Sequence, residues 1–137
     1  METLVHYGQK VNQLYEAYQR RDVDTILNSL STDCIWEVMG QPESPYAGIY
    51  HGREDVKEFF GKLEECLDMT EFTVDHILEN GNMVIASGNF NAMVRDTNKP
   101  FSSMWCMTYE FNEEEQIVHF RDCFDTLACA RAMKDTK

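Results

Sequence analysis

The chain carries near its C-terminal end the stretch Ile117-Val118-His119-Phe120-Arg121-Asp122-Cys123-Phe124-Asp125. This stretch alternates as a β-strand does, so that Val118, Phe120, Asp122 and Phe124 share one face. That face is apolar except for the Asp122 carboxylate. Burial among apolar neighbours is costly for a carboxylate, because desolvation disfavours its charged form. Asp122 is therefore either poorly placed, hydrogen-bonded, or working in a cavity.

The segments before this stretch also alternate with a period of two, which predicts more strands. We expect strands over residues 72–78, 82–95 and 101–111, and a final strand from 117. The pair Asn80-Gly81 is typical of a tight hairpin, since both residues tolerate positive φ. The strand at 82–95 has a small, apolar face, in which Gly88 is expected to leave room for a cavity.

The first half of the chain is mainly helical in pattern. Apolar residues recur at helical spacing over residues 4–20, over 23–30 behind an Asp22 N-cap, and over 53–67. Cys34 to Met39 is rich in large and branched residues and reads as a strand. The segment 40–52 contains prolines and glycines, which predict a loop.

Helices that gather on one face of a curved antiparallel sheet make an α+β fold. We expect one domain over residues 1–137, with the sheet wrapped as a cone around three N-terminal helices and followed by a short C-terminal helix that starts near Asp125. A strongly bent sheet of this kind leaves a conical cavity.

The composition is that of an ordinary globular protein, with 43% hydrophobic and 26% charged residues. The net charge of −12 argues against nucleic acid and anionic membranes as partners, because both prefer Lys/Arg surfaces. No apolar run is long enough for a membrane span. The partner expected is an apolar small molecule.

The five cysteines form no CxxC pair and their number is odd, so neither a disulfide scaffold nor a zinc knuckle is indicated. Most of them are expected to be internal, and a reducing cytoplasm is the natural compartment. No HxH, HExxH or EF-hand spacing occurs, so we expect no metal. No cofactor is expected either.

Four segments resemble the SnoaL-like family of the nuclear transport factor 2-like superfamily, to which ketosteroid isomerases and limonene-epoxide hydrolases also belong. They are Ala17-Tyr18-x-x-x-Asp22-Val23-Asp24, Asp33-Cys34-Ile35-Trp36-Glu37, Gly48-x-Tyr50-x-Gly52-Arg53-Glu54 and Phe120-Arg121-Asp122-Cys123-Phe124-Asp125-Thr126. The resemblance covers nearly the whole chain. It implies a cone-shaped α+β barrel, usually a homodimer, with a pocket shielded from solvent and no metal.

The resemblance also implies where catalytic residues would lie. The positions that match the ketosteroid isomerase base, tyrosine and aspartic acid hold Val38, Leu14 and Met107, so isomerisation by that mechanism is not expected. Tyr15 or Tyr18 could supply a hydroxyl with a different geometry.

In limonene-epoxide hydrolases the catalytic set is Asp-Arg-Asp, and the aspartate of the final strand matches Asp122. The other two positions hold Gly88 and Phe90. SnoaL-like cyclases use a late acid/base aspartate with a nearby histidine. Asp122 matches the first, but His119 has the opposite parity along the strand.

Each candidate site residue also has a structural interpretation. Asp122 is either a general acid/base with a pKa raised by an apolar pocket, or a carboxylate paired with a helix hydroxyl or water. Aromatic and methionine side chains line most small-molecule cavities but also fill ordinary cores. The substrate-binding candidates are Tyr18, Trp36, Tyr50, Phe90, Trp105, Met107, Phe120 and Phe124.

For three other candidates the structural interpretation is favoured. Asp125 lies between a strand and a helix and suits an N-cap. His119 is expected on the outer, dimer-facing side of the sheet, and His76 is also expected to be structural.

Two functional hypotheses follow. In the first, the chain is a cofactor-free enzyme that cyclises or isomerises an apolar carbonyl compound through proton transfer at Asp122. In the second, it is a non-catalytic ligand-binding or dimerisation module with the same fold. A homodimer through the outer face of the sheet is expected in either case.

Overall fold

The computed structural model describes residues 6–134, which form four helices and six strands. The helices are α1 (Tyr7–Gln19), α2 (Val23–Asn28), α3 (Gly52–Cys66) and α4 (Thr126–Met133). The strands are β1 (Leu30–Val38), β2 (Gly48–His51), β3 (Leu67–Asn80), β4 (Met83–Val94), β5 (Lys99–Phe111) and β6 (Ile117–Phe124). None of these helices is long and apolar enough to cross a membrane.

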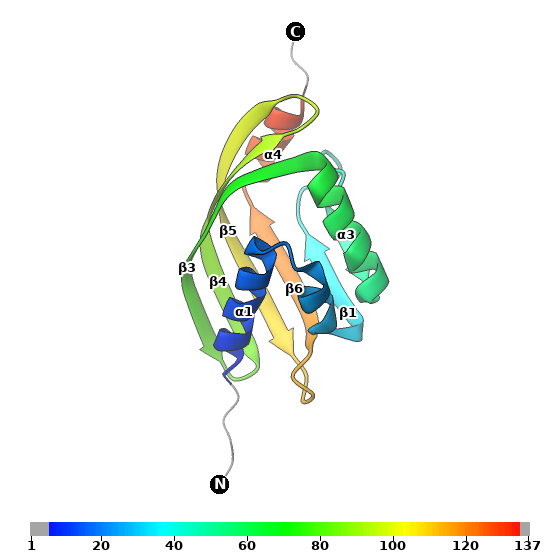
Figure 1. The fold of residues 1–137 in the computed structure, drawn as a ribbon, viewed down its shortest axis with the longest axis vertical. Coiled ribbons are helices and arrows are strands. Elements are labelled where there is room, and N and C mark those ends of the chain that lie inside the picture. Colours follow the sequence, from blue (N-terminus) through cyan, green and yellow to red (C-terminus); the bar gives the residue numbers. More distant parts are fainter. Residues whose placement is uncertain (1–5, 135–137) are drawn as a thin grey trace.

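The six strands form one curved, open sheet in the order β2-β1-β6-β5-β4-β3. Figure 1 shows α1 lying in front of the sheet and α3 standing beside β1. The predicted α+β class and the cone-like curvature around the helices are confirmed. One pair departs from the predicted antiparallel arrangement, because β1 runs parallel to β6. This pairing seats the final strand at the centre of the sheet.

The structure also contains strand residues that the sequence pattern missed. β2 lies within the segment predicted to be a loop and pairs with β1. β2 is only four residues long. It starts at Gly48 and is followed by Gly52, both with positive φ, so the segment is too short for an alternation to be recognised. β3 begins at Leu67, directly where α3 ends, rather than at 72. Leu30, predicted to close the second helix, is the first residue of β1.

Local capping signals were predicted correctly. The Asp22 side chain accepts a hydrogen bond from the Thr25 backbone N–H at 3.2 Å and caps α2. The Asp125 side chain accepts one from the Ala128 N–H at 3.0 Å and caps α4. The structural interpretation of Asp125 is therefore confirmed. Carboxylates at these positions satisfy backbone donors that a helix start leaves unpaired.

Gly88 has a different role from the one predicted. A Cβ atom at this position would lie 1.9 Å from the Thr73 carbonyl oxygen and 2.7 Å from Cζ2 of Trp105. The Trp105 ring therefore occupies the space beside the glycine, and the expectation that Gly88 leaves the cavity open is wrong. The glycine instead allows a large ring to pack directly on the backbone of β4.

The cysteines are all free, but fewer of them are internal than expected. Cys34 and Cys129 are buried, Cys66 is half-buried, and Cys106 and Cys123 are exposed. The two exposed residues are direct partners across β5 and β6. They lie on the outer face because their parity is opposite to that of Asp122.

Candidate functional site

A cavity lies between the helices and the concave face of the sheet. The empty space between its walls, together with open solvent at its mouth, amounts to about 760 Å³. Its wall is almost entirely aromatic and aliphatic, and Asp122 supplies the one carboxyl group among the described residues that line it. The lining residues are Leu14, Tyr15, Tyr18, Ile26, Trp36, Tyr46, Phe59, Phe60, Leu63, Leu67, Met69, Phe72, Phe90, Trp105, Met107, Tyr109, Phe120, Asp122 and Phe124.

Asp122 stands in the middle of the sheet, on β6. Its register partners are Met107 on β5 and Val38 on β1, and both are apolar. The residue as a whole is half-buried, yet its Oδ1 atom is shielded from solvent and has no hydrogen-bond partner among the described residues. Burial raises the pKa of this carboxyl from 3.8 to about 7. Near neutral pH the group can therefore both accept and release a proton.

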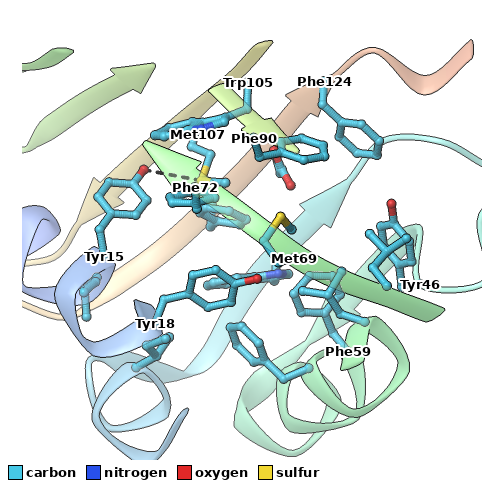
Figure 2. Close-up of a pocket in the computed structure, with 18 of the residues that line it drawn as sticks. Tyr15, Tyr18, Tyr46, Phe59, Met69, Phe72, Phe90, Trp105, Met107 and Phe124 are labelled. Atoms are coloured by element: carbon cyan, nitrogen blue, oxygen red, sulfur yellow. Dashed lines mark hydrogen bonds between the residues drawn. The ribbon is translucent and has the colours of Figure 1, made fainter. Parts of the chain in front are cut away.

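A chain of two hydroxyl groups ends at the sulfur of Met107, the register partner of Asp122. The Tyr109 hydroxyl donates to the Tyr15 hydroxyl at 2.8 Å, and the Tyr15 hydroxyl donates to the Met107 sulfur at 3.3 Å. Figure 2 shows this second bond, with the Tyr15 ring reaching from α1 towards β5. Burial raises the pKa of Tyr15 and of Tyr109, so both hydroxyls stay protonated at neutral pH. They are donors and not bases.

Two further tyrosines in the wall differ in where their hydroxyls lie. The Tyr18 hydroxyl points into the interior (Figure 2), and burial raises its pKa to about 12. The Tyr46 hydroxyl instead lies 3.2 Å from the Cys129 sulfur on α4. Tyr18 is thus available to a ligand, while the polar atom of Tyr46 has a partner in the protein.

Aromatic rings form flat surfaces on the wall. Trp36 stacks on Phe120 with 3.7 Å between ring centroids, and Phe72 stacks on Trp105 with 5.0 Å. Stacked pairs of this kind hold their rings in fixed orientations. The cavity therefore offers rigid, flat, apolar surfaces to a ligand.

Most of the candidate residues come together in this cavity. Asp122 and seven of the eight predicted contact residues line it: Tyr18, Trp36, Phe90, Trp105, Met107, Phe120 and Phe124. Whether they contact a substrate remains a proposal.

Tyr50 does not line the cavity, in contrast to the prediction. It lies on β2, its ring packs 5.4 Å from that of Phe59, and its hydroxyl donates to the Tyr46 carbonyl oxygen at 2.7 Å. Phe59 on α3 belongs to the wall and is the ring that Tyr50 contacts. The docking of α3 on the sheet thus leaves Tyr50 as a supporting residue.

Sequence reasoning missed a large part of the wall, which comes from α3, β3 and the loop before β2. Phe59, Phe60 and Leu63 were assigned only to an amphipathic stripe, and that stripe faces the cavity as well as the core. The adjacent pair Phe59-Phe60 makes the stripe wider than core packing requires, and this was the available signal. Tyr46 in the loop offered no such signal.

The histidines lie away from the cavity wall. His119 is on the outer face of the sheet, where its Nε2 contacts the Glu37 carboxylate, and its predicted opposite parity to Asp122 is confirmed. His51 is the exposed residue before α3, and His76 is exposed on β3. Within residues 6–134 no group of three or more His, Cys, Asp or Glu side chains is placed to hold a metal ion.

The sequence and the fold of this chain are similar to those of known proteins. The model of the SnoaL-like domain family matches residues 11–120. Patulin synthesis protein F from Aspergillus clavatus is 31% identical over 88 residues, which make up 63% of this chain and 44% of that protein. The match thus spans less than half the length of this relative.

Solved structures of similar fold superpose closely on this chain. A nuclear transport factor 2-like protein from Burkholderia thailandensis has a TM-score of 0.86 and 28% identity, covering 96% of this chain and 99% of that one. TerC, crystallised with polyporic acid, has a TM-score of 0.81 and 18% identity, covering 93% and 98%. The second likeness is one of fold alone.

Proposed function

The chain belongs to the SnoaL-like family, and on this premise we propose that it is a small-molecule enzyme that isomerises or cyclises an apolar carbonyl compound. Asp122 is its acid/base group. One observation carries the proposal: a carboxyl oxygen of Asp122 is buried, without a hydrogen-bond partner among the described residues, in a cavity lined mainly by aromatic and aliphatic side chains. A carboxyl placed in this way costs stability, and a proton-transfer role accounts for that cost.

The reaction begins at the carbon next to the substrate carbonyl. The ionised Asp122 carboxylate removes a proton from this carbon, and the electron pair of the C–H bond moves onto the carbonyl oxygen to form an enolate. In an isomerisation, Asp122 returns the proton at a different carbon. In a cyclisation, the enolate carbon bonds to a second carbonyl carbon of the same molecule, and the proton goes to the new alkoxide oxygen.

The walls of the cavity favour this chemistry. Because apolar surroundings solvate a carboxylate poorly, they make Asp122 a stronger base than it would be in water. The relatives agree with a small-molecule role, since TerC was crystallised with polyporic acid and the Aspergillus relative is named for patulin synthesis.

A second candidate is a ligand-binding or dimerisation module without catalysis. It is favoured by the apolar side chains beside Asp122, since Met107 and Val38 stand on either side of it in the sheet.

The outer face of the sheet exposes Ile49 at 60% and Met104 at 73%, and a homodimer through this face belongs to both proposals. Sedimentation equilibrium of the wild type and Met104→Glu tests the dimer.

Deuterium exchange tests the enzyme proposal without knowledge of the natural substrate. We would incubate 1-tetralone and 1-indanone with the protein in D₂O and follow loss of the proton signal next to the carbonyl by NMR. Enolate formation at Asp122 predicts exchange above the buffer rate, reduced 10²- to 10⁴-fold in Asp122→Asn, since this is the usual contribution of a general base.

Glu37→Gln is the matched control, because it neutralises a carboxylate on the opposite face of the neighbouring strand. It should leave the exchange rate unchanged. Binding of the ketones without any exchange that depends on Asp122 would favour the non-catalytic module.

A further inference from the structure

Two fully buried polar atoms of the cavity residues lack partners in the described part of the chain. They are Oδ1 of Asp122 and the indole nitrogen Nε1 of Trp36, and both are shielded from solvent. Trp36 itself is only 5% exposed and lines the cavity. A buried N–H without an acceptor is uncommon and costs stability, so a specific one calls for an explanation.

The other tryptophan of the cavity, Trp105, has an indole N–H that is hydrogen-bonded within the protein. Trp105 Nε1 donates to the Asn89 carbonyl oxygen at 3.3 Å and is therefore partnered within the sheet. Both indole rings are stacked on a phenylalanine ring, so both are held in place. Of the two tryptophans, only Trp36 has an indole N–H without an acceptor among residues 6–134.

Trp36 and Asp122 lie on the same face of two paired strands. In the parallel register Trp36 is opposite Phe120 and Val38 is opposite Asp122, so Trp36 and Asp122 are diagonal neighbours. A strand spacing of about 4.8 Å and a rise of about 3.3 Å per residue separate their backbones by about 8 Å. One ring-sized ligand spans this distance.

The two groups are chemically complementary to one kind of ligand. An indole N–H can only donate, so its partner must be an acceptor such as a carbonyl oxygen. A carboxyl in apolar surroundings can take a proton from the carbon beside that carbonyl. The negative charge that then develops on the oxygen strengthens its hydrogen bond to the indole, as donors aimed at an oxyanion do.

We infer that the Trp36 indole N–H binds the carbonyl oxygen of the substrate, and that the cavity takes a flat, largely apolar ketone held between aromatic rings with its acidic C–H at Asp122. This inference rests on the proposed function and makes it more specific. It assigns Trp36 as the residue that orients the substrate and stabilises the enolate.

The indole signals of the unmodified protein test the inference directly. In a ¹⁵N–¹H spectrum the two indole N–H groups give separate peaks, which Trp36→Phe assigns. We would titrate 1-tetralone and 1-indanone against tetralin and indane, which have the same skeletons without the oxygen. A ketone should move the Trp36 peak downfield far more than the Trp105 peak, and the hydrocarbons should not.

The variant gives an independent readout. Trp36→Phe keeps an aromatic ring but removes the donor, so the Kd of the ketones should rise about three- to tenfold while that of the hydrocarbons stays within about twofold. Deuterium exchange should fall about a hundredfold, the usual loss for one oxyanion donor.

The outcomes separate the inference from the proposed function. Exchange that depends on Asp122, with no Trp36 response and a fully active Trp36→Phe, overturns the inference and leaves the enzyme proposal standing. A Trp36 response without exchange supports the binding of the ketone oxygen by Trp36, and it overturns the enzyme proposal together with the enolate-stabilising role of Trp36. Failure of every ketone to move the Trp36 peak overturns the inference.

Discussion

Two carboxylates on paired strands show how one step along a strand changes their chemistry. Val38 is paired with Asp122 and Glu37 with Arg121, so the two acids come from adjacent register positions of β1 and β6. Glu37 faces outward, where His119 and Arg121 contact it, and the Arg121 Nη2 donates at 3.0 Å. Asp122 faces the cavity, and its Oδ1 has no partner among the described residues.

The pKa values of the two carboxyls move in opposite directions. The hydrogen bond from His119, reinforced by Arg121, lowers the pKa of Glu37. Burial raises that of Asp122 to about 7. The comparison teaches that the face of the sheet, and not the residue type, decides whether an acid is an ion-pair partner or a proton-transfer group.

The largest expected effect is on the pH dependence of stability. The pKa of Asp122 is raised from 3.8 to about 7 in the folded protein, which corresponds to about 4 kcal/mol. Between these pH values the folded state binds more protons than the unfolded state. Wild type should therefore lose about 4 kcal/mol relative to Asp122→Asn between pH 4 and pH 8, measured by urea unfolding.

The Glu37→Gln variant should show the opposite pH dependence of stability. Because the pKa of Glu37 is lowered on folding, its contribution is present above the unfolded pKa and is lost as the pH falls through the folded pKa. Wild type should gain stability relative to Glu37→Gln as the pH rises. Parallel curves for Asp122→Asn and wild type would show that the cavity does not perturb the Asp122 carboxyl.

The second effect concerns the packing of the Trp105 ring on β4, in the wall of the cavity that Asp122 also lines. Gly88→Ala places a methyl group against the Thr73 carbonyl and the Trp105 ring, and should lower the free energy of unfolding by about 3 kcal/mol. Ser87→Ala, one residue away on the other face of β4, is the control and should change stability little. Equal stability of the two variants would contradict the close packing.

A third change should lower the pKa of Asp122, so that it differs less from that of Glu37. Met107→Gln puts an amide N–H directly opposite Asp122, where it can donate to the buried carboxylate. A hydrogen bond to the charged form lowers a pKa, here by about 1 from its value of about 7. Titration of the ¹³C carboxyl signal measures it, and Met107→Leu should leave the value unchanged. The same pKa in both variants would mean that the amide does not reach the carboxylate.

The smallest effect is expected on the outer face. Glu37→Gln should cost at most about 1 kcal/mol at pH 7, because Arg121 and His119 are partly exposed and water screens their attraction. The loss should shrink in high salt. Chemical unfolding at low and high NaCl checks it, and a loss of several kcal/mol that salt does not alter would show that the cluster is more shielded than its exposure indicates.

Parity explains why much of the site could be predicted from the sequence. Side chains alternate along any strand, so the pattern around Asp122 was enough to place it with Phe120 and Phe124 and opposite to His119. Helix caps are equally local, and Asp22 and Asp125 were recognised from residue type and position alone.

The errors arose where two distant segments pack. Tyr50 has the residue type of a pocket residue, but it contacts Phe59, which lies in the cavity wall. Gly88 looks like an opening in the inner face, but a ring from the neighbouring strand lies against it. Neither contact can be recognised from the local spacing of residues, because both depend on how α3 and β5 pack against other elements.

The amino-acid sequence by itself determined the alternation and the caps, and with them the α+β class and the inward direction of Asp122, because these depend on neighbours within a few residues. Only the tertiary structure decided that, among the described residues, Asp122 Oδ1 and the Trp36 indole N–H have no hydrogen-bond partner and that aromatic rings from α1, α3 and five strands surround a shared space. Burial and hydrogen-bond satisfaction depend on every element around a group, and a linear pattern carries information about one element at a time.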